Sequence, residues 1–146
     1  MHRVRLATPA DLPLLLPRTR ALNDHEGIQI GDPELEAALH RLLESPELGG
    51  AWLIERDGAP VGYAIATYGY DLEFGGRDAY LTELWIDEPE RGRGAATAAL
   101  DRLAPELRGR GVHALHLQVR PENPAVRLYE RTGFVRSPRV IMTRRL

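Results

Sequence analysis

The chain has 146 residues, a formal net charge of −2 and a hydrophobic fraction of 43 %, which suit one soluble globular domain. This slightly negative charge does not favour generic binding to nucleic acid or to anionic membranes. The chain contains neither cysteine nor lysine, which excludes disulfides, thiol nucleophiles, cysteine-type zinc sites and Schiff-base chemistry.

The first third of the chain predicts a short strand and two helices. Residues 4–7 form the strand, and the Thr-Pro-Ala-Asp sequence that follows is a typical helix start. This first helix is expected to run to about residue 22, and the polar residues 23–31 are expected to form a loop. A second helix begins at Asp32 and carries leucines at helical spacing on one face.

The middle of the chain predicts three consecutive strands. Residues 52–56 form the first, and Asp57-Gly58 is a strong hairpin signal between two apolar runs. The returning strand covers residues 61–70. A turn rich in glycine and charge at residues 71–78 leads into a third strand at residues 80–86.

The last third alternates helix and strand. We expect helices at residues 95–107 and 124–132, a strand at 113–119 and a final short strand at 140–143. The resulting order, β-α-α-β-β-β-α-β-α-β, suits an α/β domain with a mixed, mostly antiparallel sheet flanked by helices. Residues 1–146 are therefore expected to make a single domain.

A small-residue loop joins the third of the middle strands to the helix at residues 95–107. Arg91, Gly94 and Ala96 fit the pattern Arg-x-x-Gly-x-Ala. Small residues let a ligand approach the backbone, and the free N–H groups of the helix's first turn favour an anion. The loop lacks the lysine of a P-loop and the third glycine of a dinucleotide fingerprint. It therefore predicts a phosphate cradle of another kind, or an ordinary strand-to-helix turn.

A second block follows, in which Asn123 and Tyr129 precede the pair Gly133-Phe134. Together, the two blocks resemble the GNAT superfamily of acyl-CoA-dependent N-acyltransferases over residues 80–134. The resemblance implies a single GNAT-like domain with a twisted sheet, acetyl-CoA as acyl donor and no metal. It also implies a possible homodimer.

The resemblance assigns the cofactor contacts to three parts of the chain. The pyrophosphate of coenzyme A would be held by the backbone of Arg91, Gly92, Arg93, Gly94, Ala95 and Ala96, with the hydroxyl of Thr97 nearby. The pantetheine arm and the acetyl carbonyl would pair with the backbone of Leu84, Trp85 and Ile86. Asn123 would bind the cofactor arm, cap its helix, or do both.

Two residues are candidates for proton transfer by the same resemblance. Tyr129 would be the general acid for the leaving thiolate, because a phenol with a pKa of about 10 can donate to a thiolate of about 8.5. Its alternative role is to anchor its helix to the sheet. Glu83 would be the general base for the amine, helped by burial that raises its pKa. Its alternative role is a local hydrogen bond in the strand, and a water chain is the alternative proton carrier.

The acceptor is expected to be a primary amine of a small cationic molecule, such as a polyamine, an aminoglycoside or a lysine-like side chain. This expectation rests on acidic residues in the segments that the resemblance assigns to the acceptor site, namely Asp24, Glu26, Asp32, Asp71, Glu73 and Asp78, with His25 among them. The simpler interpretation of these segments is a set of solvated charged loops.

The sequence thus predicts an acetyltransferase that transfers the acetyl group directly, since no cysteine is available to carry it. The alternative functions are a non-catalytic acyl-CoA-binding module and a domain that acts only through interactions. A cytoplasmic location is expected, because no apolar stretch is long enough to cross a bilayer and no signal-peptide core is present. His113 and His116 stand three apart on the expected strand and cannot share one metal.

Overall fold

A computed structural model describes residues 1–146 and contains one five-stranded sheet in the order β1-β2-β3-β4-β5. The strands are β1 His2–Leu6, β2 Gly49–Arg56, β3 Ala59–Asp71, β4 Gly76–Ile86 and β5 Ala114–Leu117. The helices are α1 Leu12–Glu26, α2 Asp32–Leu43, α3 Ala95–Gly109 and α4 Ala125–Arg131. Short 3-10 turns are formed by η1 Pro9–Asp11, η2 Leu72–Phe74 and η3 Glu88–Glu90.

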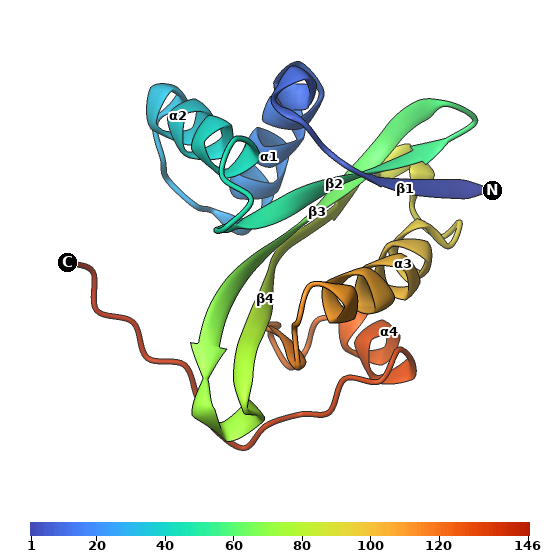
Figure 1. The fold of residues 1–146 in the computed structure, drawn as a ribbon. Helices are drawn as coiled ribbons and strands as arrows, with labels where there is room; N and C mark the ends of the chain where they lie inside the picture. Colours follow the sequence, from blue (N-terminus) through green and yellow to red (C-terminus); the bar gives the residue numbers. More distant parts are fainter.

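The sheet is mixed and mostly antiparallel, as the sequence predicts. Neighbouring strands from β1 to β4 are antiparallel, whereas β5 runs parallel to β4 after the crossover through α3. Helices α1 and α2 cover one face of the sheet, and α3 and α4 cover the other (Figure 1). The predicted α/β class and its layers of helices are therefore confirmed.

The hairpin between β2 and β3 is formed as expected. Asp57 and Gly58 both have positive φ, at 53° and 80°, which is the backbone of a turn that matches the twist of the flanking strands. The end of α1 was predicted less well. The helix continues to Glu26 and stops where Gly27 takes a left-handed φ of 69°, so the residues expected to begin the loop belong to the last turn of the helix.

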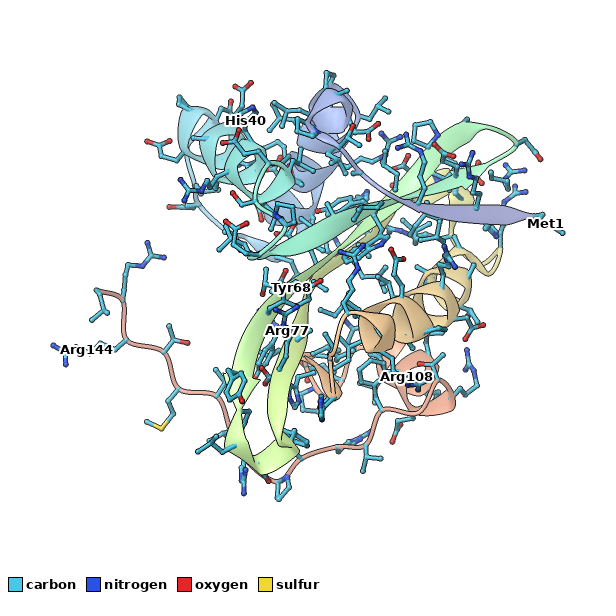
Figure 2. The ribbon with its side chains drawn as sticks, viewed as in Figure 1. Met1, His40, Tyr68, Arg77, Arg108 and Arg144 are labelled. Atoms are coloured by element: carbon cyan, nitrogen blue, oxygen red, sulfur yellow. The ribbon has the colours of Figure 1, made fainter.

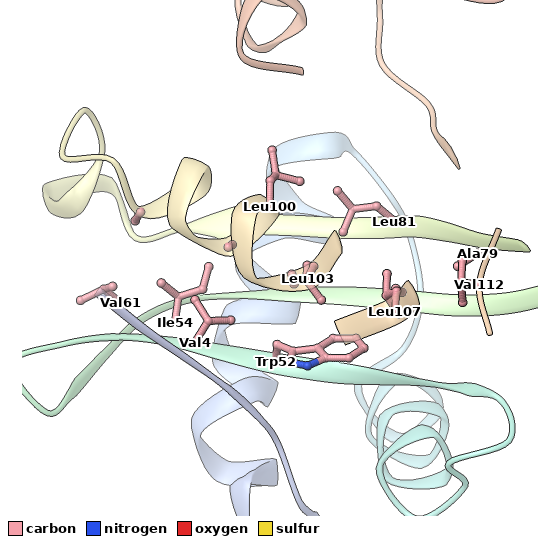
Figure 3. Packing of buried hydrophobic residues seen from close by; sticks show 14 residues of the cluster. Val4, Trp52, Ile54, Val61, Ala79, Leu81, Leu100, Leu103, Leu107 and Val112 are labelled. Carbon is pink, nitrogen blue, oxygen red and sulfur yellow. The ribbon is translucent and has the colours of Figure 1, made fainter. Parts of the chain in front are cut away.

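Two apolar clusters hold the layers together, one on each face of the sheet. On the α3 face, Trp52 and Ile54 of β2 pack against Leu103 and Leu107 of α3 (Figure 3). On the α1–α2 face, Leu53 lies in the second cluster, because successive strand residues point to opposite faces. Each such fully buried side chain contributes about 1.5–3 kcal/mol to the free energy of unfolding.

The last third of the chain departs from the prediction in two places. The strand expected at residues 113–119 is shortened to β5. The strand expected at residues 140–143 is absent, and residues 135–146 form neither helix nor strand. A strand requires a partner, and this segment contacts the tip of the β3–β4 hairpin through an ion pair between Arg139 and Glu73, at 3.0 Å, instead of lying in the sheet.

No helix of the structure combines the length and the apolar character that a membrane span requires.

Candidate functional site

The candidate site begins where β4 and β5 separate. The two strands are paired from Asp78↔Ala114 to Leu81↔Leu117, after which β4 continues to Ile86 with no strand on that side. The N–H of Asp87 donates to Val61 O of β3 at 2.8 Å. Because N–H groups alternate along an antiparallel strand, those of Leu84 and Ile86 point away from β3 and into the gap.

The loop after β4 turns tightly at its glycines. After η3, Arg91 is extended, and Gly92 and Gly94 follow with φ values of 76° and 85°. Both values lie in the left-handed region that favours glycine. Gly94 is the N-cap residue of α3, so this backbone delivers the chain directly into the first turn of the helix.

Six consecutive N–H groups of this loop and helix start make no hydrogen bond within the protein: those of Gly92, Arg93, Gly94, Ala95, Ala96 and Thr97. A Cβ built on Gly92 or Gly94 would meet no atom within 4 Å, so the space beside the loop is open. Free amides at a helix N-terminus, together with the helix dipole, favour an anion. The geometry therefore suits the phosphate cradle expected from the sequence.

Arg91 is held against the strand that precedes the loop. Its guanidinium lies 4.8 Å from the ring centroid of Trp85, and its Nε donates to Ile86 O at 2.9 Å. The indole N–H of Trp85 donates to Asp87 Oδ1 at 3.2 Å, and Asp87 is paired with Arg18 at 2.8 Å. The sequence predicts a role only for the backbone of Trp85. It does not reveal these side-chain contacts, since nothing in the sequence pairs Arg18 with Asp87.

Asn123 and Thr97 lie at the starts of the two helices on the α3 face. Asn123 Oδ1 accepts a hydrogen bond from the N–H of Ala125 at 2.9 Å. The amide side chain therefore satisfies one backbone N–H at the start of α4, although the N-cap residue of that helix is Pro124. Thr97 lies in the first turn of α3 and is half-buried.

Tyr129 lies on α4 and packs against the same apolar cluster as Leu84 and Ile86 of β4. Its ring packs edge-on against Phe134, with centroids 5.8 Å apart. Burial, followed by the negative charge of Glu26, raises the pKa of Tyr129, and the hydroxyl has no hydrogen-bond partner in the protein. The phenol is therefore protonated at neutral pH and free to donate.

Glu83 points to the opposite face of β4, toward α1 and α2. Its Oε1 accepts a hydrogen bond of 2.7 Å from the hydroxyl of Tyr63, which is fully buried. Burial raises the pKa of Glu83, and the hydrogen bond from Tyr63 offsets part of that increase. The structure thus contains both features weighed for this residue: a local hydrogen bond and a carboxylate made more basic by burial.

The raised pKa of Glu83 predicts a pH-dependent stability. The favourable contribution of Glu83 to the free energy of unfolding is fully present at pH values below its ordinary pKa of about 4.3. That contribution is lost as the pH rises through the raised pKa of the folded protein. Glu83→Gln cannot ionise and still offers Tyr63 an acceptor oxygen. We expect this variant to match the parent's Tm near pH 4 and to exceed it near pH 8, measured by calorimetry.

Glu36→Gln is the matched control, because Glu36 is exposed on α2. The Tm difference between this variant and the parent should stay constant across this pH range. A Glu83→Gln variant that loses stability equally at both pH values would contradict the prediction.

The acidic residues expected around the acceptor do not form one cluster. Asp24 and Asp32 lie near Arg20, at 3.9 and 2.8 Å. At the other end of the sheet, the buried Asp78 is paired with His116 at 3.2 Å.

The remaining acids of that set are divided in the same way. Asp71 caps the η2 turn through the N–H of Glu73, and Glu73 is paired with Arg139. Of the group, His25 and Glu26 are the ones that lie toward the gap, because His25 contacts Trp85 edge-on at 5.9 Å and the charge of Glu26 acts on Tyr129.

The aromatic residues of the β3–β4 hairpin and of β4 contact charged or aromatic side chains of the same protein. The guanidinium of Arg77 lies 4.6 Å from the ring centroid of Tyr68, and the two side chains meet on the hairpin (Figure 2). Phe74 and Tyr80 both contact the ring of His116, at 5.1 and 4.9 Å. The structure holds no group of three or more His, Cys, Asp or Glu side chains placed to bind a metal ion.

Comparison with known proteins finds similar sequences. The model of the Acetyltransferase (GNAT) family matches residues 18–134. An acetyltransferase from Yersinia enterocolitica is 34 % identical over 116 residues, which cover 79 % of this chain and 76 % of that protein.

Comparison with solved structures finds the same fold. An integron cassette protein from the mobile metagenome of Cole Harbour Salt Marsh superimposes with a TM-score of 0.87 and 29 % identity, over 98 % of this chain and 90 % of that one. A predicted acetyltransferase from Clostridium acetobutylicum, whose crystal structure contains acetyl-CoA, superimposes with a TM-score of 0.78 and 28 % identity, over 99 % and 96 %.

Proposed function

The chain belongs to the GNAT family of acetyltransferases and is an acyl-CoA-dependent acetyltransferase; from this premise we propose that it transfers an acetyl group from acetyl-CoA directly to a primary amine of a small, cationic acceptor. Residues 1–146 act as one domain in this proposal. A cytoplasmic location and a homodimer remain predictions from the sequence.

The six free amides at the start of α3 carry the proposal. They lie next to the end of β4, where the N–H groups of Leu84 and Ile86 face the gap. A pyrophosphate on the loop amides would leave the pantetheine arm directed along this strand. Arg93 would add positive charge, and the open space at Gly92 and Gly94 allows close approach.

Acetyl-CoA supplies an activated acetyl group on a thioester. A backbone N–H of β4 in the gap would polarise the thioester carbonyl and stabilise the negative charge that develops on its oxygen. Leu84 and Ile86 have N–H groups oriented for this role. The role of Trp85 in the proposal is to hold Arg91 beside the cradle through its side chain.

Tyr129 is proposed as the general acid. The departing thiolate needs a proton, and Tyr129 retains one because burial and Glu26 raise its pKa. Its hydroxyl is free of internal partners, so a bond to the leaving sulfur would compete with no existing contact.

Glu83 is proposed as the general base. An amine with a pKa of about 10.4 is only about 0.04 % neutral at pH 7, so a proton must leave it before it attacks. Burial raises the pKa of Glu83 toward that of a useful base, and its side chain lies on the α1–α2 face of β4. Tyr63 holds the carboxylate by its hydroxyl, and a water would relay the proton if the amine does not reach Glu83 directly.

A cationic acceptor is favoured by the charges that remain near the gap. Glu26 and Glu83 are carboxylates on the acceptor side, and the charge of Glu26 already acts on Tyr129. The scattered pairing of Asp24, Asp32 and Asp78 argues for a small acceptor that contacts few acids, and against a long polycation that needs many.

Two measurements test the proposal. If acetyl-CoA binds the native state, ligand at 100 times its Kd adds about 2.7 kcal/mol to the free energy of unfolding, which is a Tm rise of roughly 5–10 °C for a domain of this size. Thiol release should then be measured with a panel of primary amines containing a polyamine, an aminoglycoside and a lysine peptide. A Tm rise without turnover on any amine would favour a binding module, and no rise at millimolar acetyl-CoA would overturn both.

A further inference from the structure

The loop that carries the free amides has few contacts that could hold its shape. Residues 91–94 are all exposed, and the N–H groups from Gly92 to Gly94 make no hydrogen bond within the protein. At its far end the loop enters α3, whose first residue, Ala95, is 2 % exposed and packs in the core cluster of that face. At its near end the loop follows η3, a single turn with no buried residue. The position of the loop therefore depends on what holds η3.

Arg18, on α1, holds the start of η3. Asp87 is the N-cap residue of this turn, and its two carboxylate oxygens accept hydrogen bonds from Nε of Arg18 at 3.1 Å and from Nη2 at 2.8 Å. Such a bidentate pair fixes direction as well as distance. The guanidinium also donates to Pro60 O of β3 at 3.0 Å and to Leu14 O of α1 at 2.7 Å. Arg18 therefore ties the start of η3 to both α1 and β3.

Arg56, at the end of β2, holds the other end of the turn. Its Nε and Nη2 donate to the two carboxylate oxygens of Glu90, each at 2.7 Å, and Glu90 is the last residue of η3. These hydrogen bonds lower the pKa of Glu90, so the pair is ionised at neutral pH. Two bidentate pairs thus fix the turn from both sides. Free amides bind an anion best when their directions are set beforehand, because ordering them on binding costs free energy.

We propose that Arg18 and Arg56 are positioning residues for acetyl-CoA, which act by holding η3 so that the amides of the following loop converge on the pyrophosphate. Both guanidiniums are occupied by carboxylates, so neither needs to contact the ligand. The inference rests on the placement of the pyrophosphate given under the proposed function. It assigns a role in ligand binding to two side chains that lie outside the loop.

Attraction of the anion by the two positive charges alone is the competing explanation. The carboxylate partners distinguish the two explanations. If charge alone acted, removing the negative charge of Asp87 or Glu90 would strengthen the binding of an anion. If the pairs position the loop, the same change weakens binding, because the turn loses its attachment.

Titration calorimetry with acetyl-CoA tests the proposal. Arg18→Met and Arg56→Met should each raise the Kd about tenfold, or by ~1.4 kcal/mol. Asp87→Asn and Glu90→Gln should also raise the Kd. Arg56→Lys keeps the charge without the planar fork, so it should restore the affinity only in part. At saturating acetyl-CoA, kcat should stay close to that of the parent, because the lost contribution is to binding.

Asp11→Asn is the matched control. Asp11 also forms a bidentate pair, with Arg5 at 2.9 Å to each oxygen, and neither residue bonds to η3 or to the loop. Breaking this pair should lower the Tm and leave the Kd for acetyl-CoA unchanged. Arg56 and Glu90 are partly exposed, so their variants should fold even if Arg18→Met does not.

Three outcomes would overturn the proposal. Arginine variants that lose Tm but keep the Kd of the parent would show a purely structural role. Tighter binding by Glu90→Gln would show that charge alone acts. Gly94→Glu, titrated in parallel, separates this inference from the proposed function: if it binds like the parent, the cradle is refuted and the inference falls with it. If it fails to bind while the arginine variants bind normally, only the inference is refuted.

Discussion

Gly94→Glu is expected to abolish acetyl-CoA binding. Gly94 is the N-cap of α3, and its Cβ position opens onto the space beside the six free amides. A glutamate there would place a carboxylate where the pyrophosphate is proposed to lie, and would occupy the amides itself. The repulsion and the lost contacts should weaken binding at least about 100-fold, or ~2.7 kcal/mol, measured by titration calorimetry.

Backbone strain alone must be separated from this effect, because φ at Gly94 is 85°. Gly111 has a φ of 83° and an equally open Cβ position, but lies after the other end of α3. Gly111→Glu therefore carries the same strain and charge without reaching the loop. It should bind acetyl-CoA like the parent, and equal affinities in the two variants would refute the cradle.

Tyr129→Phe is expected to lower kcat by about 10²–10⁴ while leaving the Kd for acetyl-CoA nearly unchanged. The variant keeps the ring that packs against Phe134 and removes only a hydroxyl that bonds to nothing in the protein. The change should therefore act on proton transfer to the leaving thiolate, and steady-state kinetics with the best amine of the panel would measure it.

Tyr70→Phe is the matched control. Tyr70 is 76 % exposed on the β3–β4 hairpin and should lose its hydroxyl without consequence for kcat. If Tyr129→Phe retains the parent's kcat, the residue is an anchor of α4 and another group supplies the proton. A Tyr129→Phe variant that loses acetyl-CoA affinity in proportion to kcat would indicate a binding role instead.

The parts of the fold that were predictable from sequence are set by local chemistry. Asp57-Gly58 adopts the expected turn because few other residue pairs accept positive φ at both positions. The loop at Gly92 and Gly94 was recognisable for the same reason, since its glycines and the helix that follows define the free amides without help from distant residues.

The parts that were not predictable depend on partners far away in sequence. Trp85 could not be assigned a side-chain role, because its indole is fixed through Asp87 by Arg18, which lies on α1. The acids of the expected acceptor site separate for a similar reason, because most of them lie against an arginine, a histidine or a backbone N–H elsewhere in the structure. Their roles as acceptor contacts, and those of Tyr129 and Glu83 in catalysis, stay predictions.

The strand expected at residues 140–143 shows the limit of a propensity argument. Val140 and Ile141 favour extended backbone, but propensity cannot supply the neighbouring strand that a ladder needs.

The contact between Arg91 and Trp85 gives the protein a built-in optical reporter. The chain has two tryptophans. Trp52 is fully buried in the core, so its fluorescence should be insensitive to ligands. Trp85 instead lies under a guanidinium on one side and meets the imidazole of His25 at its edge. Changes at the proposed anion-binding loop and at the end of α1 should therefore both alter the environment of a single indole, and its fluorescence would report them without an attached dye.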